Sequence, residues 1–334
     1  MRVVEALNTS LHRLMERRSD VLIIGEDVLD PYGGAFKVTK GLSSAFPERV
    51  ITTPISEAGI VGLGTGLALR GYRPIVEIMF GDFVTLIADQ LINHASKIPW
   101  LSEHPIQLPL VVRTPMGGRR GYGPTHSQSL ERLYMGVPGL TVVAISHVYD
   151  PGEILRAAVE ESDRPILFLE NKLLYARQVV SEQGLAEHGL NVRHERGRFP
   201  TSVLSHDGAP YVTQVTSGGM LPLVIDAVEH LHRREGLACE IVVPHQLSPL
   251  DLGPIVRSVQ RTRRTVVIEE AAADWGWGSE VVARLSDIRH DSPPQRVGAK
   301  LTPVPASRAL EDQTLPQIMD IVEAAIRTVD QPFA

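Results

Sequence analysis

Short apolar segments that alternate with helix-like segments constrain the fold of this chain most strongly. Apolar runs occupy residues 21–25, 74–79, 108–114, 140–145 and 165–170. Between them, apolar residues recur at helical spacing, as in residues 3–18, or a helix is expected, as over residues 151–161. Strands that are apolar throughout are typical of parallel sheets buried on both faces. The first part of the chain is therefore predicted to form an α/β domain with helices covering a parallel sheet.

The same alternation resumes after a break. Residues 171–210 contain His, Arg, Gly and Pro but little periodicity. Apolar runs then return at 211–217, 238–244 and 264–270, with helices expected between them and a last helix over 315–329. A chain of 334 residues favours two domains. We expect a first domain at residues 1–190, a linker at 191–209 and a second α/β domain at 210–334.

Composition excludes several classes of protein. The net charge of −6 gives no electrostatic reason to expect a nucleic acid or an anionic membrane as partner. No apolar run approaches the roughly 20 residues that span a bilayer, and the N-terminus lacks the pattern of a signal peptide. The single cysteine, Cys239, excludes an intrachain disulfide and a cysteine metal cluster. A cytoplasmic protein is expected.

Residues 51–71 (ITTPISEAGIVGLGTGLALRG) contain one carboxylate, Glu57, at the start of a helix made of glycine and mainly aliphatic residues. No charged residue follows between Ala58 and Leu69, so we expect this helix to be buried on every side. Each of its glycines costs roughly 1 kcal/mol of helix stability relative to alanine, which predicts that something packs close to the backbone. Ser56 is expected to cap the helix.

Two interpretations of Glu57 stay open at this point. A glutamate in the first helical turn stabilises the macrodipole and needs no other role. Alternatively, a closed apolar site would desolvate the carboxyl and raise its pKa, so that it could exchange a proton with a ring nitrogen. Gly62, Gly64 and Gly66 do not match a dinucleotide fingerprint, because a glycine is missing at Leu67 and the glycines lie within the helix.

A glycine-rich loop, residues 115–129, carries the other candidate, His126. A loop histidine is a reasonable site residue, although many such histidines only anchor their loop. The neighbouring Arg119 and Arg120 could meet an anionic substrate or simply solvate the loop. Trp275 and Trp277 are expected to fill space or an interface.

In combination these segments resemble a known family. TPISEAGIVGLGTGLALRGYRPIVEIMFGDF, ADQLINHASK, GPTHSQSLE, VPGLTVV and RPILFLENKLLY occur in this order. They resemble the β subunit of the thiamine-diphosphate-dependent 2-oxo acid dehydrogenases, such as the pyruvate, branched-chain and acetoin dehydrogenases. VTSGGM and VVIEEAAADWGWGSEVVARL resemble the family's C-terminal domain. The resemblance implies a pyrimidine-binding domain followed by a transketolase C-terminal-type domain.

The resemblance also assigns site residues. It implies that Glu57 hydrogen-bonds the aminopyrimidine of thiamine diphosphate and that Ile55, Met79 and Phe83 form the pyrimidine pocket. It places His126 near the substrate or the lipoyl group. A structural potassium ion is implied at the backbone carbonyls of five residues. These are Leu110, Val159, Glu160, Ser162 and Arg164.

The chain lacks the family's Gly-Asp-Gly motif with a distant Asn, since the nearest match is Gly81-Asp82-Phe83 with Asn93 too close. The resemblance therefore implies that an α subunit binds Mg²⁺ and the diphosphate, in an α2β2 assembly. It also implies that this assembly acts on a 2-oxo acid and passes the acyl group to a lipoyl acyltransferase component. The sequence departs from the family before Pro138, at Gly136, and at residues 271–275. A split transketolase-like subunit and a non-catalytic scaffold or regulatory chain are the alternatives.

Overall fold

The structure is a computed structural model that describes residues 1–331 and 333 of the chain. It divides into two compact units. The first comprises residues 1–116, 133–179 and 247–249, and the second comprises residues 117–132, 180–246 and 250–334. The second thus takes in the loop that carries His126. No described helix is long and apolar enough to cross a membrane.

The first unit is built on a seven-stranded sheet with the order β11-β5-β6-β4-β3-β1-β2. All pairings among β1 to β6 are parallel. The strands are β1 (Val21–Gly25), β2 (Val50–Thr52), β3 (Arg73–Glu77), β4 (Val111–Met116), β5 (Thr141–Ala144), β6 (Ile166–Asn171) and β11 (Gln246–Ser248). Because β1, β4 and β6 are buried almost throughout, they show the continuous apolar pattern expected of a covered parallel sheet.

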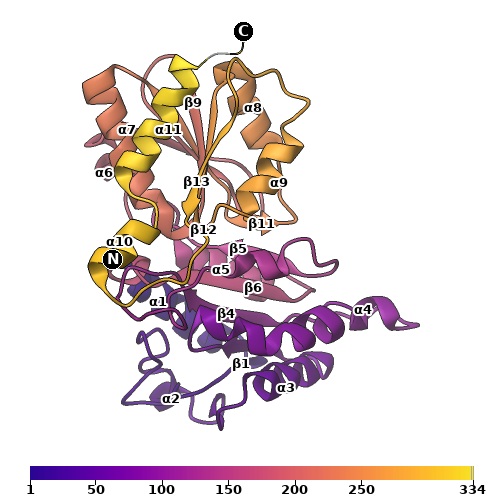
Figure 1. The fold of residues 1–334 in the computed structure, drawn as a ribbon. Coiled ribbons are helices and arrows are strands. Elements are labelled where there is room, and N and C mark those ends of the chain that lie inside the picture. Colours follow the sequence, from indigo (N-terminus) through magenta and orange to yellow (C-terminus); the bar gives the residue numbers. More distant parts are fainter. Residues whose placement is uncertain (332, 334) are drawn as a thin grey trace. The chain divides into compact units, whose positions relative to one another are not determined.

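Two groups of helices pack on this sheet (Figure 1). In one group α1 contacts α5, and in the other α3 contacts β3, η1 and η2. The helical elements are α1 (Val3–Arg17), α2 (Leu42–Ala45), α3 (Glu57–Leu69), η1 (Gly81–Ile87), η2 (Gln90–Ala95), α4 (Ile98–Leu101), α5 (Pro151–Glu160) and η4 (Leu174–Ala176). Apolar residues recur at helical spacing over residues 83–98, which predicts one helix, but residues 81–95 contain the 3-10 helix η1 and the π-helix η2.

The second unit has a six-stranded sheet with the order β13-β12-β9-β10-β8-β7. β8 is antiparallel to both β10 and β7, and the other pairings are parallel. The strands are β7 (Asn191–His194), β8 (Ser202–Ser205), β9 (Val212–Thr216), β10 (Cys239–Val243), β12 (Thr265–Ala272) and β13 (Gln295–Ala299). Both units are therefore α/β with mostly parallel sheets, as predicted.

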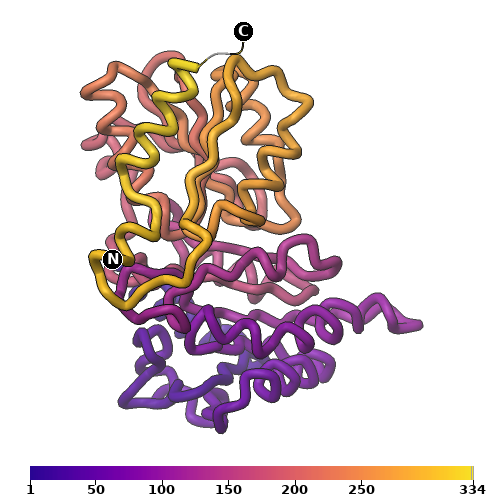
Figure 2. Tube along the Cα trace, in the orientation of Figure 1, coloured from indigo at the N-terminus to yellow at the C-terminus, as the bar shows by residue number. Residues whose placement is uncertain are grey.

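Helices flank this second sheet on either side, with α7 and α11 opposite α8 and α9 (Figure 1). α11 runs along β12 and β13, which the Cα trace shows clearly (Figure 2). The helical elements are α6 (Glu182–Ala186), η5 (Gly218–Met220), α7 (Leu221–Glu235), α8 (Gly253–Thr262), α9 (Trp277–Arg284), α10 (Arg308–Thr314) and α11 (Ile318–Asp330). η3 (Glu131–Tyr134) is divided between the units.

Candidate functional site

Candidate site residues of the first unit follow the carboxyl ends of three adjacent strands. Glu26 comes directly after β1, Glu57 follows β2, and Met79 and Phe83 follow β3. The three strands are neighbours in the order β3-β1-β2 and run parallel, so their carboxyl ends share one edge of the sheet. Ligands of open α/β sheets commonly bind outside this edge. We call it the carboxyl edge.

Glu57 is a buried carboxylate with no partner. Its residue is only 8% exposed, and it begins α3. Within the described residues, no hydrogen bond or ion pair reaches its side chain, and its carboxylate oxygens are not fully buried, so they face solvent-accessible space. The expected cap is wrong, because the Ser56 side chain makes no capping hydrogen bond. Glu57 thus presents a carboxylate without a partner among the described residues of this chain at the carboxyl edge.

Glu26 is a second acid at the carboxyl edge, and the sequence analysis missed it. Its side chain is buried, and its Oε1 has no hydrogen-bond partner within the described residues. Burial raises the pKa of the Glu26 carboxyl, and the nearby charge of Glu57 raises this pKa further. Two buried acids close enough to interact can hold and move a proton between them. Only the strand order brings them together, so their spacing in the sequence gave no signal.

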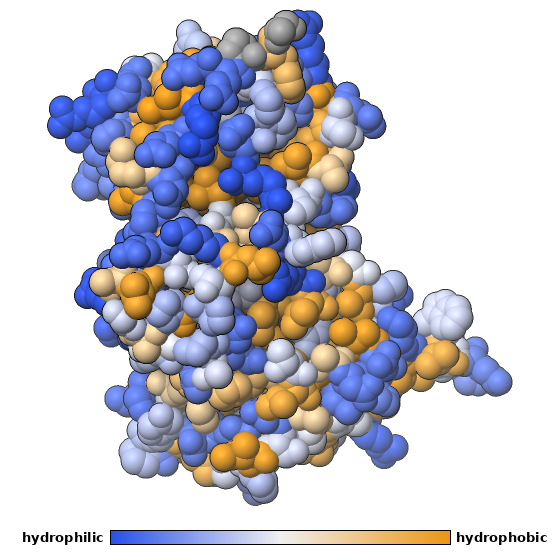
Figure 3. All heavy atoms as spheres, viewed as in Figure 1, coloured by the Kyte–Doolittle hydropathy of each residue, from blue (hydrophilic) through white to orange (hydrophobic). Residues whose placement is uncertain are grey.

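The prediction that α3 is buried on every side is wrong. One face packs on the sheet, where a Cβ built on Gly64 would lie 2.7 Å from the Val76 side chain. The opposite face is exposed at Gly59, Leu63, Gly66 and Leu69. Apolar side chains gather in the region of α3 and α4 in the space-filling view (Figure 3). The composition of α3 is that of a fully buried helix, yet within this chain only one of its two faces is buried.

Three apolar residues were expected to form the pocket for the pyrimidine ring. Ile55 is 83% exposed, whereas Met79 and Phe83 are half-buried. Phe83 lies in η1, which packs on α3, the helix that Glu57 begins. Its ring meets Phe80 edge to face, with 5.8 Å between the ring centroids. The structure therefore puts a supported aromatic ring and an exposed aliphatic side chain on segments next to the buried acid.

A buried ion cluster joins the three adjacent strands β3, β4 and β6. We call Arg113, Glu77 and Glu170 the Arg113 cluster. Arg113 on β4 donates from Nε to Glu170 Oε1 at 2.8 Å and from Nη2 to Glu170 Oε2 at 2.6 Å. Its Nη1 donates to Glu77 on β3. The two carboxylates raise the pKa of Arg113 against the opposing effect of burial, so the guanidinium is firmly charged.

His126 belongs to the second unit. It is half-buried, and its Nδ1 lies 3.0 Å from the Thr125 hydroxyl. Two carboxylates hold the glycine-rich loop in place. Glu270 accepts from the Gly118 backbone N–H at 2.7 Å, and Glu311 accepts from the backbone N–H of Arg119 at 2.7 Å. Buried acids of the same unit therefore fix the backbone of the loop, and this fixes the position of His126.

The carbonyl groups expected to hold potassium already have donors. The expected set was Leu110, Val159, Glu160, Ser162 and Arg164. Nη1 of Arg73 donates to the carbonyl oxygens of Val159 at 2.6 Å and Ser162 at 3.1 Å. The Leu110 oxygen accepts from the Ile166 N–H at 2.8 Å. The Arg73 guanidinium therefore contacts two of the five expected carbonyl groups, and potassium binding at this set stays a prediction.

The departures from the family pattern have local structural roles. Gly136 has a φ of 72°, a left-handed conformation that favours glycine, and its N–H donates to the Ser248 hydroxyl at 3.1 Å. Ala271 and Ala272 end β12. Of the two tryptophans expected to fill space or an interface, Trp277 is buried but Trp275 is 86% exposed.

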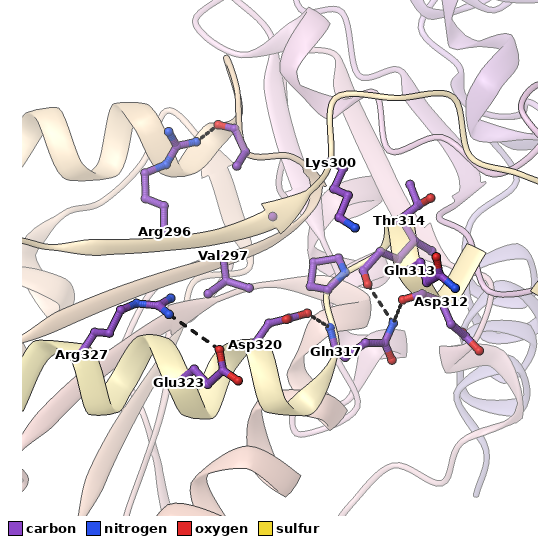
Figure 4. A pocket seen from close by; sticks show the side chains of 14 residues that line it. Arg296, Val297, Lys300, Asp312, Gln313, Thr314, Gln317, Asp320, Glu323 and Arg327 are labelled. Carbon is purple, nitrogen blue, oxygen red and sulfur yellow. Dashed lines mark hydrogen bonds and ion pairs between the residues drawn. The ribbon is translucent and has the colours of Figure 1, made fainter. Parts of the chain in front are cut away.

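A cavity of about 510 Å³ lies in the second unit between β13 and α11 (Figure 4). Lys300 points into it, while Arg327 pairs with Glu323 and Asp320 accepts from the Gln317 N–H. None of the predicted site residues lines it. Only Arg327 and Glu323 pair with each other among the described charged residues that line it, and the cavity shares no residue with the candidate site.

Comparison with known proteins supports the family resemblance. The family model for "Transketolase, pyrimidine binding domain" matches residues 1–178, and that for "Transketolase, C-terminal domain" matches residues 203–321. The chain is 36% identical over 333 residues to "Pyruvate dehydrogenase E1 component subunit beta-1, mitochondrial" of Arabidopsis thaliana, covering 98% of this chain and 89% of that protein.

Two further comparisons agree. The chain is 34% identical to "Acetoin:2,6-dichlorophenolindophenol oxidoreductase subunit beta" of Bacillus subtilis, covering 98% of this chain and 97% of that one. A solved chain described as "Split gene transketolase, inactive beta4 tetramer" superposes with a TM-score of 0.76 over all of both chains, at 23% identity, which supports the fold alone. The chain therefore belongs to the family of β subunits of the thiamine-diphosphate-dependent 2-oxo acid dehydrogenases.

Proposed function

We propose that this chain is the β subunit of a 2-oxo acid dehydrogenase that oxidatively decarboxylates its substrate and passes the acyl group to a lipoyl group. The observation that carries this proposal is the buried, unpartnered carboxylate of Glu57 at the carboxyl edge. Membership of the family supplies the chemistry that such a carboxylate serves. The active site is proposed to be shared with an α subunit that holds the diphosphate through Mg²⁺.

The residues at the carboxyl edge fit the aminopyrimidine of thiamine diphosphate. A flat heteroaromatic ring needs apolar or aromatic contact on its faces and a polar group at its edge. Ile55, Met79 and Phe83 offer the first, and Glu57 offers the second. When bound, thiamine diphosphate supplies the nucleophilic carbon and the electron sink that decarboxylation needs.

The chain's own residues then have proposed roles. Glu57 hydrogen-bonds the ring nitrogen of the aminopyrimidine, because its carboxylate is the group at the carboxyl edge that has no partner within the described residues of the chain. Glu26 modulates that proton through its charge. Phe83 orients the ring by contact. His126 is proposed to act on the substrate or the acyl acceptor from its anchored loop.

A product assay tests the reaction. The chain is expressed with a candidate α subunit and assayed with thiamine diphosphate, Mg²⁺ and a panel of 2-oxo acids. An artificial electron acceptor or a lipoyl domain serves as acceptor. We expect carbon dioxide release from at least one 2-oxo acid. Transfer of ketol units between sugar phosphates instead would favour the transketolase-like alternative, and no Glu57-dependent cofactor binding would favour a scaffold.

Exposure of one face of α3 supports the proposed α partner. Gly66 lies on this face with nothing within 4 Å of a built Cβ, so alanine there fits the chain and should raise its helix stability by up to about 1 kcal/mol. We expect Gly66→Ala to leave the thermal unfolding of the β chain unchanged or slightly raised, yet to weaken its association with the α subunit, measured by analytical ultracentrifugation. Tight association of the variant would contradict a partner that packs closely on this face.

Gly64→Ala is the matched control, since it makes the same substitution on the opposite face of the same helix. Its Cβ would lie 2.7 Å from the Val76 side chain and 3.1 Å from that of Leu110. Such overpacking should destabilise the fold by about 1–3 kcal/mol in thermal or urea unfolding. We expect Gly66→Ala to weaken association without lowering the stability of the fold, whereas Gly64→Ala lowers that stability.

A further inference from the structure

The Arg113 cluster reaches beyond the strands through one tyrosine. Tyr175 in η4 is buried, and its hydroxyl donates to Glu170 Oε2 at 2.6 Å. Glu170 receives Arg113 on both of its oxygens, so its position is fixed by a bidentate ion pair. A buried hydroxyl on such a carboxylate has little freedom. The tyrosine ring is therefore held at a defined place beside the sheet.

Aromatic contacts continue from this ring toward the candidate cofactor pocket. Tyr175 stacks on Phe36, with centroids 5.2 Å apart and planes at 30°. Phe36 meets Phe80 edge to face at 5.8 Å, and Phe80 meets Phe83 in the same manner at 5.8 Å. The Nζ of Lys172 lies 5.3 Å from the centroid of Phe80. The four rings form a continuous series that ends at Phe83.

The loop that carries Phe36 passes close to the same cluster. A Cβ built on Gly34, two residues earlier, would lie 2.9 Å from Glu77 Oε1. Gly34 has a φ of 78°, so glycine is favoured there and the loop can approach the carboxylate closely. Tyr175 is thus hydrogen-bonded to one carboxylate that Arg113 holds, and the backbone before Phe36 lies against the other.

We infer that Phe36 and Tyr175 are positioning residues that hold Phe83 at the orientation in which it contacts the aminopyrimidine. The inference rests on the proposed function, because Phe83 is the proposed ring contact. Neither residue lies at the proposed pocket itself. Their effect passes through Phe80, because its ring contacts both Phe36 and Phe83 edge to face.

Tyr175→Phe and Phe36→Leu test this in the complex with the α subunit. Each should weaken thiamine diphosphate binding about three- to tenfold by calorimetry, the range that losing one such contact gives. The KM for the 2-oxo acid should stay within about twofold. The double variant should bind like Phe36→Leu alone, since Tyr175 can act on Phe83 only through Phe36. Unchanged cofactor binding, or multiplied effects in the double variant, would overturn the inference.

A second readout does not depend on the cofactor. With 4-fluorophenylalanine incorporated in the complex, the resonance of Phe83 is identified by its loss in Phe83→Leu. We expect Tyr175→Phe to move this resonance, whereas Tyr149→Phe, which removes a hydroxyl elsewhere in the same unit, should not. An unmoved Phe83 resonance in Tyr175→Phe contradicts the inference. Failure of the wild-type complex to bind thiamine diphosphate would instead contradict the proposed function.

Discussion

Glu57→Gln is expected to reduce 2-oxo acid decarboxylation by the reconstituted complex about a hundredfold to ten-thousandfold, the range for loss of a positioned acid-base group. Glutamine keeps the size of the side chain but cannot release or take up a proton at the ring nitrogen. Because Glu57 makes no hydrogen bond or ion pair within the described residues, the fold loses no contact. Thermal unfolding should therefore be unchanged or slightly raised, while turnover collapses.

Glu48→Gln is the matched control for this experiment. Glu48 is an exposed glutamate of the same unit, so the same substitution there changes the net charge equally without touching the carboxyl edge. Its activity should equal that of the wild type. If Glu57→Gln turned over normally beside this control, Glu57 would have no role in cofactor chemistry and the proposed function would lose its main support.

The regular parts of the fold could be predicted from the sequence because their burial is complete. β1 lies where its apolar run predicted, and α1 and α5 end within one residue of the expected bounds. Strands at the sheet margins could not be predicted in this way. The residues of β7 are largely exposed, and those of β13 are partly buried and partly half-buried. Neither strand therefore shows a continuous apolar run.

The site could be predicted only where a single residue was unusual in its own segment. Glu57 stood out as the one charge in an apolar helix. Glu26 did not, because its meaning depends on strand order, which local pattern does not contain. Arg113 is similar, since it is the one charged residue in the run at 108–114. Only the pairing of β3, β4 and β6 brings its two carboxylates to it.

The irregular helix at residues 81–95 has a tertiary cause. A Cβ built on Gly81 would lie 2.8 Å from the Met116 side chain, so the backbone of η1 approaches the end of β4 closely. The buried Tyr134 hydroxyl donates to the carbonyl of Val84, taking an oxygen that regular helix would use internally. Side-chain periodicity predicts the apolar face of such a segment but not these competing contacts.

Arg113→Met should be the most destabilising of the substitutions considered, by about 3–5 kcal/mol in urea unfolding. Methionine has a similar length but no charge, so Glu77 and Glu170 would remain buried beside each other without a cation. Burial already raises the pKa of Glu77, and loss of the cation would raise it further above its value in the unfolded state. The folded variant would bind more protons than the unfolded chain, so its stability should rise as pH falls from 8 toward 5.

Arg156→Met separates burial from charge pairing. Arg156 also contacts several carboxylates, those of Glu153, Glu160 and Glu161, but on the partly exposed surface of α5. Water screens these pairs, so the variant should lose less than about 1 kcal/mol and show little change in pH dependence. Two results would contradict this account of the Arg113 cluster. One is equal destabilisation of the two arginine variants, and the other is no gain in the stability of Arg113→Met at low pH. The hydrogen bond from Tyr175 to Glu170 would then not be enough to explain how the aromatic series that ends at Phe83 is held on the sheet.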